Sequence, residues 1–358
     1  MPHTIRELAR ATGLRAEGAL DMEIDRAAEP GEAGPRDLAL AMDRRYAPAL
    51  EDSAARAAVL WDGADWQALG LEAALFAPRA RLALAGLTEA FAAPPEIEPG
   101  LHPQAAIHAS AVLGRDVWVG PFTTIGPRAR IGEGSRIAGN VTIGADCVIG
   151  AGALIHPGVR IGGHARIGER VIAQPNAVIG ADGFSFVTPR EGAVERAKRT
   201  GEVSEDARNT DYRRIHSLGG IEIGADVEIG AGACIDQGTI APTRIGRGTK
   251  IDNLVQIGHN GQVGETCLIC GHVGLAGSVT VGDRAVLGGK VGVGDNLTIG
   301  ADAVLAGGTL VGSDVPPGSV MIGVPAMPRA EFLAQVRALR RLPRMQAQVA
   351  ALREKLGI

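Results

Sequence analysis

Aromatic side chains are scarce in this 358-residue sequence, in which phenylalanine, tryptophan and tyrosine together make up only 3%. Glycine is abundant instead, with 51 residues, about twice its usual share. These two figures argue against an ordinary layered globular chain. A hydrophobic content of 46% with 21% charged residues is too apolar for a disordered chain, and the glycines lack the three-residue period of collagen. The composition therefore indicates a folded repeat.

Cysteines and long apolar runs are also few. The four cysteines do not suggest a disulfide framework, and the Cys267-x-x-Cys270 pair has no second pair that would complete a zinc site. The sequence contains no run of about 18 apolar residues, so it predicts no transmembrane helix. Its first residues become charged too early for a signal peptide. We therefore expect a cytoplasmic protein without a metal site.

An excess of one charge is absent as well. The sequence has 36 basic and 40 acidic residues, a net charge of −4. This balance removes the electrostatic case for general binding to nucleic acid or to an anionic membrane. A charged partner would have to recognise a local patch.

What the sequence does contain is a hexapeptide repeat. An aliphatic residue recurs at every sixth position from Ile107 to Ile179 and again from Ile223 to Val311, with a weak position at Ala173. The repeat slips by four residues between Asp236 and Arg244. An α-helix cannot keep this period, because its 3.6-residue turn would rotate successive aliphatic side chains about 120° apart.

A coil with three flat sides can keep the period. If each hexapeptide forms one short strand and a corner, three of them make an 18-residue coil whose aliphatic side chains point to the axis. Glycine usually follows the aliphatic residue, as in Ile125-Gly126, and we expect it to permit the tight corners. Coils would stack at the strand spacing of about 4.8 Å. The repeat thus predicts a mainly β protein, a parallel β-helix of about nine coils.

Other segments flank or interrupt this β-helix, which we place at residues 102–328. Residues 1–101 lack the repeat and predict a small α/β domain, with a capping box at Thr4-Ile5-Arg6-Glu7, a strand over 57–60 and a helix over 81–92. The spacing between Ile179 and Ile223 is not a multiple of six, which predicts an inserted loop at about 181–220. Loops of this length are usually functional or disordered.

Residues 329–358 predict C-terminal α-helices. The first covers about 329–342 and ends before Pro343, and the second carries a heptad-like apolar stripe. The segment holds seven basic residues and two acidic ones, a net charge of +5. A solvated helix face with an oligomer seam and a docking surface for an acidic partner both fit this pattern. The stripe consists of Met345, Val349, Leu352 and Leu356.

A candidate catalytic residue stands out in the second run of coils. His259 ends the polar stretch Asp252 to Asn260, and the 18-residue period places Gly277 directly beside it on the next coil. A general base next to a backbone N–H is the pairing that acyl transfer needs, because the N–H stabilises the oxyanion. We expect Asp252, seven residues earlier, to orient the imidazole; a corner-turn role for Asp252 is the alternative.

These features together resemble the UDP-3-O-(3-hydroxyacyl)glucosamine N-acyltransferase family, enzymes of lipid A biosynthesis in Gram-negative bacteria. The resemblance covers almost the whole chain. Its most specific parts are the Asp-Gly-Phe and Gln-Ile-x-His-Asn segments. The matching stretches are Gly100-Leu101-His102-Pro103, Gly180-Ala181-Asp182-Gly183-Phe184-Ser185-Phe186, Ile251-Asp252-Asn253, Gln256-Ile257-Gly258-His259-Asn260 and Ala276-Gly277-Ser278.

The resemblance implies a left-handed β-helix, a homotrimer and a specific reaction. Family members transfer a (3R)-3-hydroxyacyl chain from acyl carrier protein to the 2-amino group of UDP-3-O-acylglucosamine, giving UDP-2,3-diacylglucosamine. Carried over, His259 is the general base, Asp252 its orienter and Gly277 the oxyanion donor. The same resemblance makes Asp182, Phe184, Gln256 and Asn260 substrate-binding residues. No bound cofactor is implied, since phosphopantetheine on the acidic carrier protein holds the acyl group, and that carrier would suit the basic C-terminal segment.

This sequence departs from the family at two sites. The amino-terminal uridine pocket of the family has the pattern Phe-x-x-Asn-Pro-Lys-Tyr, where this chain has Leu40 to Tyr46. Tyr46 can still stack on uracil, whereas Asp43 has lost the amide donor. A second family histidine, near the phosphates or the pantetheine arm, falls on Asn296, which cannot carry charge. Leu310 falls near the position that bounds the acyl channel of the family.

Other functions keep the same fold. The chain could be an O-acyltransferase acting on UDP-N-acetylglucosamine or an acetyl-CoA-dependent sugar N-acetyltransferase, but the amino-terminal domain, the Asp182-Gly183-Phe184 segment and the basic tail argue against both. A zinc hydratase built on such coils needs three metal-binding histidines, and no third histidine follows His259 and His272 at coil spacing. A non-catalytic solenoid scaffold is the remaining alternative.

Overall fold

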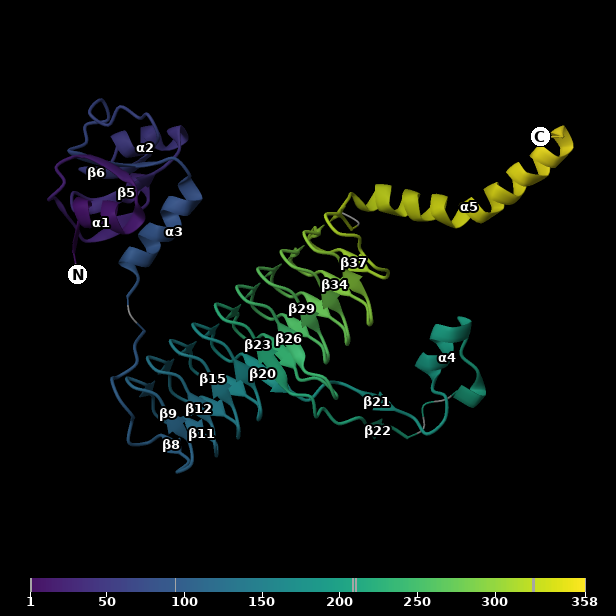
Figure 1. The fold of residues 1–358 in the computed structure, drawn as a ribbon. Coiled ribbons are helices and arrows are strands. Elements are labelled where there is room, and N and C mark those ends of the chain that lie inside the picture. The colour runs from purple at the N-terminus through teal and green to yellow at the C-terminus, as the bar shows by residue number, and fades with distance from the viewer. Residues whose placement is uncertain (1, 94, 208, 210, 324–325, 358) are drawn as a thin grey trace. The chain divides into compact units, whose positions relative to one another are not determined.

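The computed structural model describes residues 2–93, 95–207, 209, 211–323 and 326–357. The chain divides into two compact units, Met1–Glu96 and Ile97–Ile358 (Figure 1). Within the described residues, no helix combines the length and the apolar character needed to cross a bilayer.

The first unit is an α/β domain around a five-stranded sheet of order β2-β7-β6-β5-β4. Strand β2 runs antiparallel to β7, and the other neighbours are parallel. Buried side chains of α1 and α3 form one core with the sheet, and α2 contributes Leu50 to a second. The elements are β1 (His3–Thr4), α1 (Ile5–Thr12), β2 (Arg15–Gly18), β3 (Glu23–Ile24), β4 (Arg26–Ala28), η1 (Pro30–Glu32), β5 (Asp37–Ala41), η2 (Arg44–Tyr46), α2 (Ala47–Glu51), β6 (Ala57–Trp61), β7 (Ala73–Ala77) and α3 (Ala80–Phe91).

The local signals expected in this unit are confirmed. The Thr4 hydroxyl accepts a hydrogen bond from the Glu7 backbone N–H (3.2 Å), and the Glu7 carboxylate accepts one from the Thr4 N–H (2.8 Å). This reciprocal pair satisfies two N–H groups that helix α1 leaves without a helical partner. The predicted strand and helix are β6 and α3.

The second unit is a left-handed parallel β-helix with three flat faces. The first face contains β8 (Ala106–Ile107), β11 (Thr124–Ile125), β14 (Thr142–Ile143), β17 (Arg160–Ile161), β20 (Val178–Ala181), β25 (Cys234–Asp236), β28 (Gln256–Ile257), β31 (Gly274–Leu275), β34 (Gly292–Val293) and β37 (Leu310–Val311). The second face contains β9 (Val112–Leu113), β12 (Arg130–Ile131), β15 (Val148–Ile149), β18 (Arg166–Ile167), β23 (Ile221–Ile223), β26 (Thr243–Ile245), β29 (Gln262–Val263), β32 (Thr280–Val281) and β35 (Thr298–Ile299). The third face contains β10 (Trp118–Val119), β13 (Arg136–Ile137), β16 (Leu154–Ile155), β19 (Ile172–Ala173), β24 (Glu228–Ile229), β27 (Lys250–Ile251), β30 (Leu268–Ile269), β33 (Val286–Leu287), β36 (Val304–Leu305) and β38 (Val320–Met321).

The expected 18-residue register is confirmed. Ile125 pairs with Ile143, and Ile257 pairs with Leu275. The repeat aliphatic residues are buried along the axis, where they form one continuous core. The preceding residue of each two-residue strand points outward, so side chains on the flat faces are free to contact ligands or partners.

We expected the repeat glycines to permit the tight corners, and this explanation is wrong. The corner residue in the left-handed backbone region is usually not glycine: Asn140, Asp146 and Asn260 have φ angles of 59°, 59° and 61°. The glycine after the aliphatic residue is needed for close packing instead. A Cβ at Gly126 would lie 2.8 Å from the backbone nitrogen of Ala145 on the next coil. Stacking of the coils, rather than the corner, excludes a side chain there.

The predicted insertion leaves the coils after β20 and rejoins them at β23 (Figure 1). It consists of β21 (Phe186–Val187), α4 (Ala193–Thr200), η3 (Glu205–Ala207) and β22 (Arg213–Arg214), with β21 antiparallel to β22. Helix α4 is tied back to the coils by an ion pair between Lys198 Nζ and Asp295 (2.5 Å). The insertion, which leaves the coils after Ala181, therefore contacts a coil that comes more than a hundred residues later in the sequence.

The expected pair of C-terminal helices is wrong, because one helix, α5 (Arg329–Leu356), continues through Pro343. Proline removes one helical hydrogen bond and bends a helix without always ending it, and α5 is visibly bent in Figure 1. No described residue of α5 is buried, and the predicted apolar stripe is exposed.

We expect the interior and exterior residues of one strand to differ sharply in their effect on stability. In β14, Ile143 is 1% exposed and Thr142 faces outward. Ile143→Ala should lower the free energy of unfolding by about 2–5 kcal/mol. The matched Thr142→Ala variant should change it by less than about 0.5 kcal/mol. Urea denaturation followed by circular dichroism measures both, and equal effects would contradict the assigned strand polarity.

Candidate active site

His259 lies at the corner between the first and second faces, after β28 and before β29. Its imidazole is flanked by two glycines. A Cβ at Gly183 would approach the His259 Cβ to 2.7 Å, and a Cβ at Gly277 would approach Cε1 and Nε2 to 2.7 Å. Both neighbours must therefore lack a side chain for the ring to occupy this place.

The expected stacking of Gly277 on His259 is confirmed. The Ser278 N–H donates to the His259 carbonyl (2.8 Å), and the Asn296 N–H donates to the Gly277 carbonyl (3.0 Å). The Gly277 N–H donates no hydrogen bond to any described residue. Gly277 thus lies beside the Nε2 edge of the imidazole and has an unused N–H, which makes it a candidate oxyanion donor.

Asn260 orients the imidazole. Its amide nitrogen Nδ2 donates to the Ala241 carbonyl (3.0 Å), while its Oδ1 accepts from the Thr239 N–H (3.1 Å). These two bonds fix which amide atom is oxygen, and that oxygen lies 3.0 Å from His259 Nδ1. Since Oδ1 can only accept, Nδ1 carries the proton in the neutral ring and Nε2 is left as the base.

The expected contact of Asp252 with the imidazole is not formed in this chain. Asp252 follows β27 and lies at the corner before β28, whereas His259 follows β28. The Asp252 carboxylate accepts from the Asn253 N–H (2.7 Å), and its Oδ2 lies 3.1 Å from a Cβ built on Gly271. The seven residues between Asp252 and His259 span one face of the coil, so the two side chains lie at successive corners. Asn260 takes the place expected for Asp252.

Asp236 is a functional candidate that sequence reasoning missed. It ends β25 and is 7% exposed. Burial raises the pKa of its carboxyl, and this is opposed by hydrogen bonding from Gln256 and by the charge of His259. The one available signal was its position at the start of the four-residue slip in the repeat. A buried acid with a raised pKa near His259 fits the pattern of titratable groups at active sites.

Several predicted substrate-binding residues meet at the His259 corner. Asp182 accepts a hydrogen bond from the Gln237 side chain (2.9 Å), and its charge raises the pKa of Asp236. Gln256 lies on β28, and Asn260 contacts His259. Gly183 is held by its N–H, which donates to the buried Ser217 hydroxyl (3.0 Å). Both ends of the insertion are therefore anchored beside the imidazole.

Other predicted residues lie farther along the chain. Phe184 is 87% exposed and makes an edge-to-face contact with Phe186, with ring centroids 5.1 Å apart. Asn296 occupies the same corner position as Asn260 two coils later, and its amide donates to Asp295 (3.1 Å).

The remaining two predicted residues belong to the amino-terminal unit. Asp43 accepts from the Arg45 N–H (3.0 Å). The Tyr46 hydroxyl accepts from the Arg45 guanidinium (2.9 Å), which also lies 4.8 Å from the centre of the Tyr46 ring. Asp43 thus acts as an N-cap in this structure and Tyr46 presents a ring already paired with a cation.

An outward groove follows the coil of His259 on the first face. Across successive coils, the outward position of Gln256 is occupied by Gly274, then Gly292 and then Leu310. A Cβ at Gly292 would lie 3.0 Å from Leu310 Cδ2, and Leu310 is 83% exposed. Two missing side chains followed by a leucine form a groove with an apolar stop. Within the described part of the chain, no three His, Cys, Asp or Glu residues are grouped closely enough to hold a metal ion.

Comparisons with known proteins agree with the hexapeptide-repeat fold. The model of the bacterial transferase hexapeptide family (six repeats) matches residues 110–145 and 146–181. A UDP-3-O-acylglucosamine N-acyltransferase of Ruegeria pomeroyi is 56% identical over 357 residues, covering 100% of this chain and 98% of that protein. The Paracoccus denitrificans enzyme of the same name is 58% identical over 278 residues, 78% of this chain and 76% of that one.

One solved structure supports the fold independently. The Arabidopsis UDP-N-acetylglucosamine acyltransferase superposes with a TM-score of 0.52 at 25% identity, covering 63% of this chain and 71% of that chain. The coils and the His259 corner thus define a hexapeptide-repeat acyltransferase. Within that class, the near full-length identity to the bacterial enzymes shows that this chain belongs to the UDP-3-O-acylglucosamine N-acyltransferase family.

Gly277→Ala should disable the site without unfolding the coils. The added methyl would displace the imidazole by its contact with Nε2, and a misplacement of about 1 Å can cost about a hundredfold in rate. Gly312→Ala is the matched control, since a Cβ there meets nothing within 4 Å. Amide-forming rates and circular dichroism of both variants test this, and full activity of Gly277→Ala would contradict the proximity.

Asp236→Asn should stabilise the protein at neutral pH. Because folding raises the pKa of this carboxyl, its ionised form opposes folding at high pH, and the opposition disappears as the pH falls and the group protonates. The urea midpoint of the variant should therefore exceed that of the wild type at pH 8, with a gap that narrows toward pH 4. Glu202→Gln, an exposed charge removal, should show no such gap. A gap that widens in acid would contradict the burial argument.

Proposed function

We propose that this protein transfers a (3R)-3-hydroxyacyl chain from acyl carrier protein to the 2-amino group of UDP-3-O-acylglucosamine, giving the diacylated lipid A precursor. The observation that carries the proposal is that Gly277, whose N–H is unused, lies against the Nε2 edge of His259 in a chain of this family. The O-acyl and N-acetyl alternatives and the scaffold alternative are not favoured, because the full-length relatives carry the N-acyltransferase name.

In the proposed mechanism, His259 Nε2 removes a proton as the 2-amino group attacks the thioester carbonyl. The carbonyl oxygen becomes an oxyanion that accepts a hydrogen bond from the Gly277 N–H. Collapse of this intermediate breaks the carbon–sulfur bond, and the imidazolium returns the proton to the departing phosphopantetheine thiol. Asn260 holds the tautomer throughout, because its Oδ1 bonds to the Nδ1 proton of both the neutral and the protonated ring.

The donor chain is proposed to lie in the groove of the first face. Gly274 and Gly292 leave room along the outside of the coils, and Leu310 bounds that room three coils beyond Gln256. An extended acyl chain needs such a continuous apolar surface. This groove starts next to the coil that carries His259, so a thioester at the corner and a chain in the groove are compatible.

Carrier-protein docking is proposed at α5. The helix and its last residues carry the net charge of +5, and no ion pair joins a basic residue of α5 to any described acidic residue. Unpaired basic side chains suit an acidic partner. The acyl donor would arrive covalently on that partner's phosphopantetheine, so no resident cofactor is required. Use of this donor would put the reaction in the cytoplasm.

A homotrimer is proposed from exposed apolar residues. Leu268, Val286, Val304 and Val320 form an outward column on the third face, in which Leu268, Val304 and Val320 are 46%, 39% and 78% exposed. The stripe on α5 adds further unpaired apolar surface. Apolar patches of this extent are typical of protein interfaces. For the acceptor nucleotide, Tyr46 is proposed to stack on uracil, and Asn296 to hydrogen-bond to a phosphate or to the pantetheine arm.

His259→Ala should lower kcat for amide formation by about a hundredfold or more, since the variant loses the general base. The assay combines UDP-3-O-acylglucosamine with 3-hydroxyacyl carrier proteins of several chain lengths and detects the diacylated product by mass spectrometry. His108→Ala, at the equivalent corner of the first coil, is the control and should retain wild-type activity. Equal rates for His259→Ala and wild type would remove His259 from the mechanism, whereas wild-type activity only with UDP-N-acetylglucosamine would refute the substrate.

A further inference from the structure

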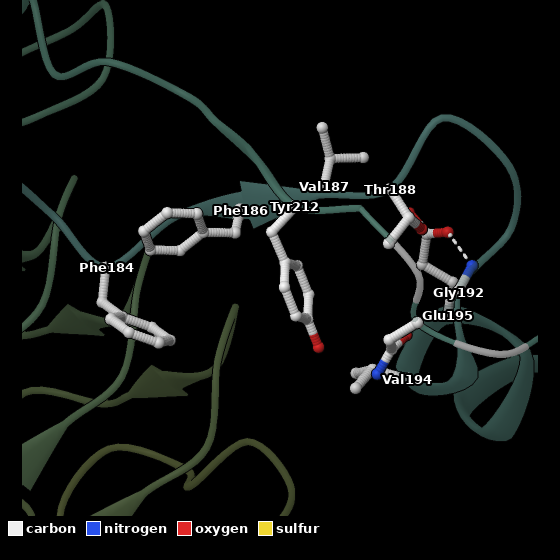
Figure 2. Close-up of a pocket in the computed structure, with 9 residues that line it drawn as sticks. Phe184, Phe186, Val187, Thr188, Gly192, Val194, Glu195 and Tyr212 are labelled. Carbon is white, nitrogen blue, oxygen red and sulfur yellow. Dashed lines mark hydrogen bonds between the residues drawn. The ribbon is translucent and has the colours of Figure 1, made fainter.

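Two cavities of similar size differ in their chemistry. The cavity of the insertion has a volume of about 520 Å³, and Figure 2 shows the rings of Phe184, Phe186 and Tyr212 along it. The other has a volume of about 530 Å³ and lies on the second face of the first coils. We call it the arginine cavity, because Arg130 and Arg166 line it. Aromatic rings dominate the first lining and positive charge the second.

The 18-residue register builds the arginine cavity. Val112 pairs with Arg130, Arg130 with Val148, and Val148 with Arg166. These are the outward positions of β9, β12, β15 and β18, so valine and arginine alternate over four successive coils. Arg130 and Arg166 are two coils apart, which is about 10 Å at the usual strand spacing. The adjoining corner contributes Ser110, Arg128, Asp146 and His164.

Arg130 and Arg166 lack the carboxylate partner that most other arginines of the coils have. Neither forms a hydrogen bond or an ion pair with any residue that the structure describes. Both side chains belong to exposed residues. The paired arginines elsewhere on the coils include Arg115 with Glu133 (2.9 Å), Arg170 with Asp226 (2.6 Å) and Arg284 with Asp302 (2.7 Å).

The one acid of the arginine cavity is already neutralised. Asp146 accepts two hydrogen bonds of 2.7 Å from the Arg128 guanidinium, and its Oδ2 lies 4.0 Å from His164 Nδ1. Three arginines against one aspartate leave the cavity with a net charge of +2. All donors of Arg130 and Arg166 are free, and a guanidinium presents parallel N–H groups that match two oxygens of a phosphate.

An ion pair separates the arginine cavity from the His259 corner. The outward column of Arg166 continues through Glu222, Arg244 and Gln262. Arg244 Nε lies 2.8 Å from the Glu222 carboxylate, so these two charges satisfy each other. Gln262 lies on the strand that follows His259, so Arg166 is three coils, about 14 Å, below that level. A ligand in the arginine cavity would therefore lie apart from the reacting groups.

We propose that Arg130 and Arg166 bind the phosphate group of a ligand other than the acceptor. Their guanidiniums flank Val148 and can donate to the oxygens of one dianion, which would supply the counter-charge that the chain does not provide. Val112 and Val148 offer apolar contact to the carbon atoms of an organic phosphate. The ligand is thus either free phosphate or a small phosphate ester, and this site lies outside the proposed reaction.

Phosphate titrations of the full-length protein, followed by 31P NMR at constant ionic strength, test the proposal. The double variant Arg130→Gln/Arg166→Gln should raise the Kd for inorganic phosphate about tenfold or more, because it removes both charged donors. Arg115→Gln/Arg284→Gln is the matched control, since it removes the same two charges from arginines that are already paired. Its Kd should stay within about twofold of the wild type. Circular dichroism verifies that both variants fold.

Phenyl phosphate distinguishes the two sources of the phosphate group. Tighter binding of phenyl phosphate than of inorganic phosphate would indicate an organic ester as the ligand, and weaker binding would indicate free phosphate. Either order supports the site, provided that the Arg130→Gln/Arg166→Gln variant loses the binding. Equal Kd values for the two double variants, or displacement of phosphate by the same concentration of nitrate, would overturn the proposal.

Two further outcomes would assign the arginines to another partner. The diphosphate resonances of UDP-3-O-acylglucosamine report its own binding in the same spectra, and inorganic phosphate should stay bound when they show saturation. Displacement of phosphate by the bound acceptor would make the arginines part of the acceptor site and overturn the proposal. A change of oligomeric mass in Arg130→Gln/Arg166→Gln, measured by analytical ultracentrifugation, would assign them to a contact with a second copy of the chain and overturn it likewise.

Discussion

Backbone pairing between successive coils is the interaction on which this structure depends. Each two-residue strand is too short to be stable alone and is held by the strands 18 residues before and after it. The close approach of these backbones explains why glycine follows so many repeat aliphatic residues, since a Cβ at Gly126 or Gly144 would collide with the next coil. The same pairing makes residues that are 18 positions apart into neighbours, which is how His259 meets Gly277.

The His259 corner is built where the repeat is disturbed. The insertion leaves after β20, and the four-residue slip follows β25, so the coils around His259 carry extra backbone. That backbone supplies Gly183 on one side of the imidazole and the Thr239 and Ala241 groups that orient Asn260. Regular coils could not provide these groups, because every corner of an uninterrupted repeat has the same short geometry. The irregularities are the means by which a uniform solenoid obtains one distinctive site.

The sequence alone determined the β-helix, because a six-residue aliphatic period has few physical solutions, and the same period placed Gly277 beside His259. It also determined the insertion and the capping box of α1, which depend on local spacing. Only the tertiary structure decided the partner of the imidazole. Asp252 is a charged residue only seven positions before His259, but these seven residues span a whole face, so Asp252 lies at the previous corner. The ring is contacted instead by Asn260, whose amide is held by backbone groups of the four-residue slip. The sequence pattern also did not determine the burial of Asp236, the cavity of the insertion or the continuity of α5 through its proline. Each of these depends on contacts with neighbours that the spacing of residues does not reveal.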